Sequence, residues 1–257
     1  MHSSAKHSPE VARGSCLPSE VAVSGKSIAN MQPYFLPYIG YWQLIGAADV
    51  FVVYDNIKYT KKGWINRNRF LLNGKEALFS LPLRKDSDFL DVNQRYLADA
   101  FNREDLINRF REAYRKAPEY SAFMPVLEDI IRCPSDNLFD YIRYSIGKVC
   151  LYLDLKTPVI VSSSIDCDHS LKAAERVQAI CKALGAETYI NPPGGRELYA
   201  KADFERNGLN LKFLQPHLTE YAQLGNSFVP WLSILDVAMC NRAEQVRYQV
   251  LSGYSLE

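Results

Sequence analysis

The sequence lacks the features that would place the protein in a membrane or on nucleic acid. No apolar run approaches the roughly eighteen residues that a transmembrane helix requires. Lysine and arginine total 30 against 29 aspartates and glutamates, so there is no basic excess for binding a phosphate backbone. Residues 1–26 are polar and contain no apolar stretch of the kind found in secretory signals. These absences predict a cytoplasmic protein with no membrane span and no nucleic-acid partner.

The sequence also lacks the spacings of metal sites and of common catalytic centres. None of the six cysteines pairs at C-x-x-C spacing, so we expect no metal ion. No P-loop, G-x-G-x-x-G, H-E-x-x-H or G-x-S-x-G pattern with matching context is present. Of the four histidines, His217 directly follows a predicted strand and is a candidate general base.

What the chain does contain is a dense motif at residues 31–42, MQPYFLPYIGYW. Its two prolines exclude a strand interior and prevent a helix from starting before Pro37. We therefore expect a strand that ends near Gln32, a rigid loop, and a helix entered near Tyr38. Such junctions in α/β proteins face ligands, which makes Gln32, Tyr38 and Tyr41 candidate site residues. The alternative is a hydrophobic corner that only seals the sheet.

A second polar segment follows the next predicted strand. Residues 50–54, VFVVY, form a β-branched and aromatic run that is typical of a strand buried on both faces. Asp55 comes directly after it, at the ligand side of a parallel sheet, and is a candidate catalytic base. Amides, cations and an aromatic ring follow at Lys58, Lys61, Trp64, Asn66, Arg67 and Asn68. This set suits phosphate, carboxylate or sugar hydroxyls, although a solvated hairpin edge would have a similar composition.

The remaining pattern predicts a mostly parallel α/β sheet with a β-hairpin and a helical insertion. Asn73-Gly74 between apolar runs is a strong hairpin signal. Helical spacing at 99–116, 122–132 and 135–153 predicts an insertion over about 99–153, with Ser135 as the cap of its last helix. The other expected elements are a strand at 157–163, a helix at 171–184 ended by Gly185, a strand at 187–190 and a final strand at 210–214. Residues 228–239 are expected to enter a last helix, with Ser227 or Ser233 near its start. We expect a flexible tail at 1–26 and a single domain at 27–257.

Two later positions are also candidate site residues. Asn191, Gly194 and Gly195 follow the strand at 187–190, and a Gly-Gly pair lets backbone approach a ligand closely. Asp236 lies in an otherwise apolar helix, where a carboxylate needs a partner if it is buried. The partner we expect is Arg67, Asn68 or a backbone amide, unless Asp236 lies on an exposed helix face.

Three groups of residues together resemble the WbqC-like protein family. They are the motif at 31–42 with Asp55 and residues 58–68, the segment NPPGGRELY at 191–199, and LSILD at 232–236. The resemblance runs from about Ile28 to Leu256. It implies a role in O-antigen or other surface-polysaccharide synthesis, with aminoacyl transfer to an amino sugar as the implied activity. Many members carry His before Gln-Pro, and this chain has Met31 there, so a role for that His does not carry over.

The loop at Phe35-Leu36-Pro37 is also similar to the opening of nucleotidyltransferases, which implies a Rossmann-like (nucleotidyltransferase/HUP-like) fold. Gly40-Tyr41 stands where those enzymes have Gly-His, and both of their catalytic histidines are missing. Binding of ATP phosphates by that electrostatic route is therefore not expected here.

Our leading hypothesis is an enzyme that transfers an acyl or aminoacyl group to the amine of a nucleotide-linked amino sugar. Lys61 and residues 66–68 would bind the diphosphate, and Tyr38, Tyr41 and Trp64 would line the pocket. Gln32 and Asp55 would lie beside the reacting centre. The donor would be an activated thioester, an aminoacyl ester or an adenylate. A carrier protein or a charged tRNA would deliver it, and this tRNA is the one exception to the expected absence of a nucleic-acid partner. The alternatives are an ATP-dependent ligase or nucleotidyltransferase, and a non-catalytic scaffold subunit of a polysaccharide-synthesis complex.

Overall fold

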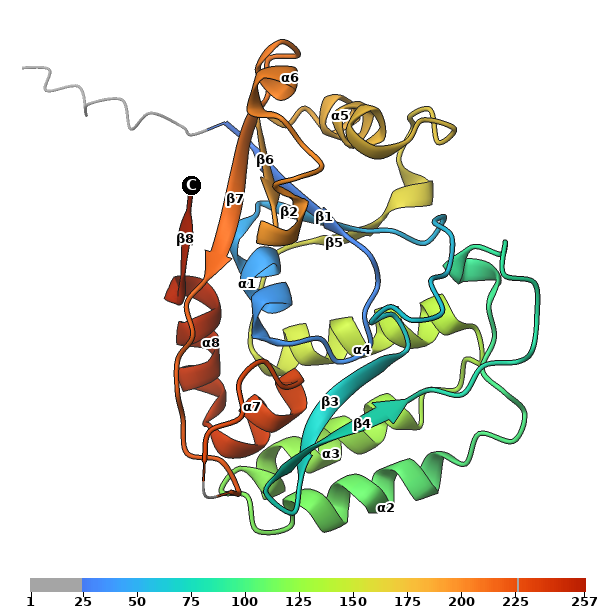
Figure 1. Ribbon diagram of the computed structural model, residues 1–257, viewed down its shortest axis with the longest axis vertical. Coiled ribbons are helices and arrows are strands. Elements are labelled where there is room, and N and C mark those ends of the chain that lie inside the picture. The colour runs from blue at the N-terminus through green and yellow to red at the C-terminus, as the bar shows by residue number, and fades with distance from the viewer. Residues whose placement is uncertain (1–24, 226) are drawn as a thin grey trace, which may run out of the picture.

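A six-stranded β-sheet forms the centre of the computed structural model, which describes residues 25–225 and 227–257 (Figure 1). In space the strands follow the order β5-β2-β1-β6-β7-β8. The first five run parallel, and β8 pairs antiparallel with β7. The strands are β1 Ser27–Met31, β2 Val50–Val53, β5 Val159–Val161, β6 Thr188–Asn191, β7 Asn210–Pro216 and β8 Tyr254–Leu256. The prediction of a mostly parallel sheet is confirmed.

A separate antiparallel hairpin, β3 Arg67–Leu72 and β4 Lys75–Ser80, lies apart from this sheet. Its turn residues, Asn73 and Gly74, have φ values of 51° and 73°. Positive φ at both central residues is typical of the type I′ turn, which matches the twist of the flanking strands. The hairpin predicted from Asn-Gly is therefore confirmed.

Eight α-helices connect these strands in the described part of the chain. They are α1 Ile39–Ala47, α2 Arg103–Tyr114, α3 Tyr120–Ile131, α4 Leu138–Tyr152, α5 Ala173–Ala183, α6 Lys201–Glu205, α7 Ile234–Cys240 and α8 Ala243–Ser252. Figure 1 shows α2 and α3 beside the hairpin, at the end of the molecule away from α5 and α6. None of the helices described is long and apolar enough to cross a bilayer.

Two apolar cores lie on the two faces of the sheet. The larger contains Phe51 and Val53 of β2 and joins the sheet to α1, the hairpin, α2–α4, α7 and α8. The smaller contains Val50 and Val52 and is covered by residues of α5 and α6. The alternation along β2 follows from the two-residue period of a strand. The same period gives Asn30, Tyr54, Tyr189 and Asn191 one common face, the face that α5 and α6 cover.

Three expectations about local structure are wrong. The strand at 210–216 is not the last one, because α8 and β8 follow it and β8 pairs with its end. The segment 228–233 is not helical, and α7 begins at Ile234; of the two predicted start residues it is Ser233 that caps the helix, since its Oγ accepts from the Leu235 amide at 3.1 Å. Ser135 does not cap α4; the Asn137 side chain accepts from the backbone N–H groups of Phe139 and Asp140 at 3.0 and 3.2 Å. An Asx side chain two residues nearer the helix reaches those donors, whereas Ser135 accepts from Asn137 itself.

The predicted end of α5 is confirmed, since Gly185 follows the helix with φ of 63°, a conformation that favours glycine. The predicted flexible tail at 1–26 lies, for residues 1–24, outside the described residues.

Candidate functional site

The strand order reverses at β1, and a cavity lies at that reversal. Numbered along the chain, the strands of the sheet run 3-2-1-4-5-6, so β2 lies on one side of β1 and β6 on the other. In open α/β sheets the crevice at the carboxyl ends of such strands is the usual ligand site. A cavity of about 590 Å³ is lined here by residues that end β1 and β6, including Gln32 and Asn191. We call it the switch-point cavity.

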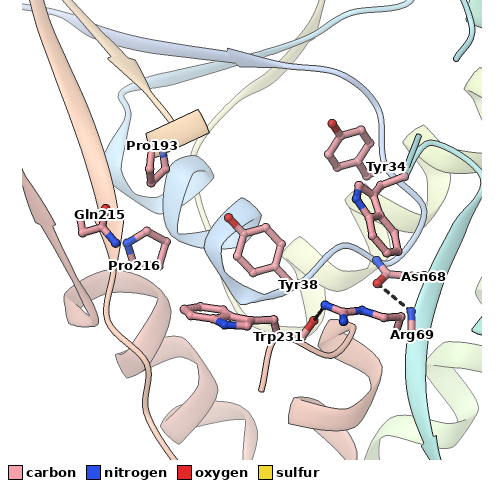
Figure 2. Close-up of a pocket in the computed structure, with 9 residues that line it drawn as sticks. Tyr34, Tyr38, Asn68, Arg69, Pro193, Gln215, Pro216 and Trp231 are labelled. Carbon is pink, nitrogen blue, oxygen red and sulfur yellow. Dashed lines mark hydrogen bonds between the residues drawn. The ribbon is translucent and has the colours of Figure 1, made fainter. Parts of the chain in front are cut away.

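A second cavity of about 370 Å³ adjoins the first, and both are lined by Tyr34, Tyr38 and Pro193. Figure 2 shows its side chains converging from the opening loop, from β3, from the end of β7 and from the segment before α7. It is lined by Tyr34, Tyr38, Trp64, Asn68, Arg69, Pro193, Gln215, Pro216 and Trp231. We call it the aromatic cavity, and the two cavities together the cleft.

Hydrogen bonds to the carbonyls of Leu36 and Pro37 hold the opening loop in place between the two cavities. The Leu36 carbonyl accepts from Asn68 Nδ2 at 2.9 Å and from Ser233 Oγ at 2.7 Å. The Pro37 carbonyl accepts from Trp42 Nε1 at 3.1 Å and from the Ile234 amide at 2.9 Å. The loop is thereby tied to β3 and to the start of α7. These bonds position Tyr34 and Tyr38, which line both cavities.

Backbone strain also lies at this point of the structure. Leu36 and Trp231 adopt φ values of 46° and 59°, in the left-handed region that side chains disfavour. Trp231 stands 6.0 Å from Tyr38, ring centroid to ring centroid, in an edge-to-face arrangement. Strain of this kind persists only where surrounding contacts impose it, and it gathers at functional sites. Here it aims an exposed indole into the aromatic cavity.

Four side chains form a buried hydrogen-bonded chain along the switch-point cavity. Asn30 Nδ2 donates to Tyr54 Oη at 2.9 Å, and Tyr189 donates to Asn30 Oδ1 at 2.6 Å. Tyr189 Oη also lies 3.1 Å from Asn191 Oδ1, and Asn191 Nδ2 is buried without a partner. Burial raises the pKa of Tyr54 and Tyr189, so both hydroxyls stay protonated.

The hydrogen-bond distances indicate which group donates and which accepts in each contact of these four side chains. A phenol has one hydrogen, so Tyr189 cannot donate to both asparagines. The 2.6 Å contact is typical of O–H···O, and the contacts at 2.9 and 3.1 Å are typical of N–H···O. The single phenol hydrogen and these distances are both accounted for if the Asn191 amide is turned by about 180°, so that Nδ2 donates to Tyr189 Oη. Asn191 Oδ1 is then an unpaired acceptor, and the Tyr54 hydroxyl hydrogen is an unused donor.

Gly195 makes room for the Asn191 amide. A Cβ at position 195 would lie 1.8 Å from the terminal amide atom of Asn191 that faces it, whereas a Cβ at position 194 would meet nothing within 4 Å. Because glycine carries hydrogen there, its Cα–H points at that amide atom. Such a contact is favourable to oxygen and not to N–H, which supports the same orientation.

Arg69 is the charged residue of the cleft. Among the described residues, Asp, Glu, Lys, His and Cys are absent from the lining of both cavities. Arg69 pairs with Glu76 at 2.9 Å and donates to the Trp231 carbonyl at 3.1 Å, while its Nε is buried without a partner. Its guanidinium carbon also lies 5.4 Å from the Trp64 ring centroid. One positive charge and several aromatic rings therefore face this part of the cleft.

Comparison with known proteins agrees with the motifs of this site. The WbqC-like protein family matches residues 32–248. The chain belongs to that family. It is also similar to the uncharacterized protein Rv1507c of Mycobacterium tuberculosis, with 26% identity over 226 residues that cover 87% of this chain and 97% of that protein. No solved structure matches the chain significantly.

In this WbqC-like chain, seven of the predicted site residues line the cleft. They are Gln32, Tyr38, Trp64, Asn68, Asn191, Gly194 and Gly195. Gln32 Oε1 accepts from Tyr34 Oη at 3.2 Å. Tyr41 lies beneath the cleft, 2% exposed, and donates to the Gln32 carbonyl at 3.0 Å. It therefore supports the floor of the switch-point cavity from below.

Asp55, predicted as the base, lies outside the lining of both cavities. Its Oδ1 accepts from Ser162 Oγ at 2.9 Å and from the Ser163 amide at 3.0 Å, and its Oδ2 accepts from Asn93 Nδ2 at 3.0 Å. Although burial opposes the charged form, these donors together lower the pKa of Asp55. A carboxylate held in this way ties β2 to the end of β5.

The cationic side chains at positions 58–67, before the end of the first hairpin strand, make contacts outside the cleft. Lys61 pairs with Asp88 at 2.7 Å, and Lys58 Nζ lies 4.5 Å from the Phe89 ring centroid. Arg67 donates through Nε to the Gly63 carbonyl at 2.9 Å, which fixes its own loop. The structure thus does not bring Lys58, Lys61 or Arg67 into the cleft.

His217 and Asn66 also lie elsewhere. His217 is exposed beside a cavity of about 30 Å³ near α7, away from the linings of the cleft. Asn66 lines a third cavity, which is described below.

The prediction for Asp236 is wrong in its partners. The residue is fully buried and accepts from Tyr114 Oη at 2.8 Å, Tyr221 Oη at 2.7 Å and Gln223 Nε2 at 2.8 Å. Neither Arg67 nor Asn68 contacts it. Burial raises the pKa of Asp236 despite these donors. Its place is in the core between α2 and α7, outside the cleft.

Sequence reasoning missed several residues of the cleft. Asn30, Tyr54 and Tyr189 occur within or next to apolar strand segments, where a polar residue near the carboxyl end is the only available signal. Arg69 directly follows the polar segment that ends at Asn68, and Trp231 directly precedes the segment LSILD at 232–236, but neither is among the predicted site residues.

Proposed function

We propose that the protein transfers an acyl or aminoacyl group to the amine of a nucleotide-linked amino sugar in surface-polysaccharide synthesis. The observation that carries the proposal is the pair of adjoining cavities at the strand reversal, one aromatic with an arginine and one lined by uncharged hydrogen-bonding groups. A nucleotide-linked sugar has the same two parts. The strand order supports a Rossmann-like fold for this purpose.

The aromatic cavity suits the nucleotide. Trp231, Tyr38 and Trp64 offer ring faces for a base, since every base has an apolar face that stacks. The guanidinium of Arg69, which lines this cavity, would donate to a diphosphate oxygen in a charge-assisted hydrogen bond.

The switch-point cavity suits the amino sugar. Asn191 Oδ1, which is buried against Gly195, would accept from the amine when the segment 193–195 shifts on binding, and the Tyr54 hydroxyl would donate to a neighbouring sugar oxygen. Gly194 and Gly195 let the chain approach the sugar closely. An acceptor and a donor on one wall recognise a substrate with a donor and an acceptor at matching positions.

The attack on the acyl donor does not require a general base, because the attacking amine is already unprotonated. The unprotonated amine attacks the acyl carbon of the donor with its lone pair, an N–C bond forms, and the bond to the thiolate or alkoxide leaving group breaks. The nitrogen loses one proton, which the leaving group takes up. Asn191 Oδ1, by accepting an N–H hydrogen, would hold the lone pair toward the donor. The proposal places the protein in the cytoplasm, where nucleotide-linked sugars are made.

The test is product formation. Purified protein is incubated with UDP-linked amino sugars and glycyl or acyl thioesters, and the product mass is followed. We expect an N-acylated nucleotide sugar from the wild type and at least about tenfold slower formation by Asn191→Leu, which keeps the branched shape and removes the polar amide. Absence of product with every such pair, from protein that binds the nucleotide sugar, would reject transfer.

That last outcome would favour a second candidate, a non-catalytic subunit that binds the nucleotide sugar. The observation in its favour is the lack of any carboxylate, histidine or cysteine among the described residues lining the cleft. It predicts binding and Asn191 dependence without turnover.

A further inference from the structure

A third cavity, of about 420 Å³, lies between the segment that follows β2 and the segment that follows β4. It shares no lining residue with the cleft. Its lining consists of Tyr59, Lys61, Asn66, Ser80, Leu81, Pro82, Leu83, Arg84, Lys85, Asp86 and Arg95. Four of these are cations and one is an anion. We call it the basic cavity.

Arg95 is the feature that distinguishes the basic cavity from a charged surface. The residue is only 4% exposed, and its guanidinium carbon lies 4.9 Å from the Tyr59 ring centroid. It donates to two backbone carbonyls, those of Ser87 at 2.9 Å and Arg84 at 3.3 Å. Its Nε is buried without a partner. No carboxylate of the described residues forms an ion pair with it, so a buried positive charge has only neutral acceptors.

A buried guanidinium without an anion is costly, because burial removes water that would otherwise stabilise the charge. An anionic ligand beside the guanidinium would offset this cost. Carbonyl contacts on Nη1 and Nη2 fix the guanidinium plane, which prepares it for a planar, directional contact.

The wall around Arg95 is held rigidly by hydrogen bonds. Tyr59 Oη donates to Asn66 Oδ1 at 2.9 Å, and Asn66 Nδ2 donates to the Leu81 carbonyl at 2.7 Å. The Leu81 amide in turn donates to the Asn66 carbonyl at 2.7 Å. These bonds join the two segments that form the cavity and set the ring on which Arg95 stacks.

The remaining cations stand at the rim. Lys61 pairs with Asp88 at 2.7 Å and Arg84 pairs with Asp99 at 2.6 Å, but both pairs are largely exposed and such pairs contribute little. Lys85 is exposed and forms no ion pair within the described chain. Asp86 in the lining, with Asp88 and Asp99 in the two ion pairs, balances the three rim cations, so the net positive charge of the basic cavity is that of Arg95.

We propose that the basic cavity binds the phosphate group of a small phosphate ester or of free diphosphate. A phosphate group carries several acceptor oxygens and a double or higher negative charge, so it can neutralise Arg95 and take hydrogen bonds from Lys85 and Arg84. This proposal does not depend on the transfer reaction proposed for the cleft, and phosphate binding at the basic cavity can be tested separately from it.

Calorimetric titration at constant ionic strength tests this with three probes: inorganic pyrophosphate, ADP and adenosine. Pyrophosphate binding would identify phosphate as the recognised group, and tighter binding of ADP would identify an ester as the source. Adenosine is expected not to bind at this site. Lys85→Glu should weaken pyrophosphate binding about tenfold or more, and Arg95→Lys, which keeps the charge and loses the fork, should weaken it as well.

Two controls separate this site from other sources of affinity. Lys75→Glu makes the same charge change at an exposed hairpin position outside the lining and should leave the affinity unchanged. Arg69→Met removes the cation that the proposed function assigns to a diphosphate, so binding lost in this variant belongs to the cleft and binding that remains belongs to the basic cavity. The proposal is overturned if pyrophosphate does not bind, if Lys75→Glu weakens binding as much as Lys85→Glu, or if only Arg69→Met abolishes it.

Discussion

Tyr189 Oη lies 2.6 Å from Asn30 Oδ1, and this bond joins neighbouring strands β1 and β6 at the point where the strand order reverses. Because the phenol donates here, it accepts from Asn191, and the orientation of the Asn191 amide follows. A core hydroxyl thereby decides which atom the switch-point cavity offers to a ligand.

Tyr189→Phe should therefore affect both stability and binding. The substitution leaves Asn30 Oδ1 and Asn191 Nδ2 without a partner, and we expect a loss of about 1–3 kcal/mol in the free energy of unfolding. Binding of a UDP-linked amino sugar should weaken in the folded variant, because Asn191 is free to turn. Urea unfolding and calorimetry measure the two effects.

Tyr199→Phe is the matched control, since Tyr199 packs edge-on against Tyr189 at 6.1 Å between ring centroids and is half-buried. It should change unfolding by no more than about 0.5 kcal/mol. Equal effects of the two variants would contradict the hydrogen-bonded chain.

The Gly-Gly pair offers a sharper comparison. Gly195→Ala places a methyl group 1.8 Å from the present position of the Asn191 amide atom, which must move. We expect ligand affinity to fall about tenfold and stability to fall by about 1–3 kcal/mol. Gly194→Ala meets nothing within 4 Å and should bind normally. Unchanged binding by Gly195→Ala would show that Asn191 does not contact the ligand.

Trp231 allows the backbone strain to be measured. Residue 231 has a φ of 59°, a conformation that only glycine adopts freely. In urea unfolding, Trp231→Gly should therefore have a free energy of unfolding about 1 kcal/mol higher than Trp231→Ala. The same pair of substitutions at Trp64, which has no positive φ, should give the opposite order. If alanine is the more stable replacement at both positions, Trp231 is not strained.

Asp236 predicts a pH dependence with a definite sign. Its pKa is raised in the folded protein, so above about pH 4 the unfolded chain loses this proton before the folded chain does. The stability that Asp236 contributes is thus fully present below its unfolded pKa and is lost as pH rises through its folded pKa. The unfolding free energy of the wild type minus that of Asp236→Asn should decrease over this range. A difference that grows with pH would contradict the raised pKa.

Much of the sheet and the hairpin could be predicted because their signals are local. The run at 50–54 and the pair Asn73-Gly74 each specify an element within a few residues. The edge strand β8 could not be predicted, because Tyr254–Leu256 is short and half-exposed and exists only by pairing with β7.

The sequence predicted the edge of the sheet at which the cleft lies, but it predicted fewer of the individual residues that line the cleft. Strand ends marked the correct edge, and the motif residues Gln32, Tyr38 and Asn191 do line the cleft. The contacts of Asp236 and Asp55 depend on residues distant in the chain. Tyr114 is 122 positions from Asp236, and Ser162 is 107 positions from Asp55. No local pattern carries that information, and only the packing of α2 and β5 supplies it.

The central claim is that Asn191 and its neighbours hold the amino sugar of a nucleotide-linked substrate. Calorimetric titration of a UDP-linked amino sugar into the wild type and into Asn191→Leu tests it most directly. We expect saturable binding by the wild type and affinity at least about tenfold lower in the variant, with the same unfolding cooperativity in both. No binding to the wild type, or equal affinity in the two proteins, would contradict the account.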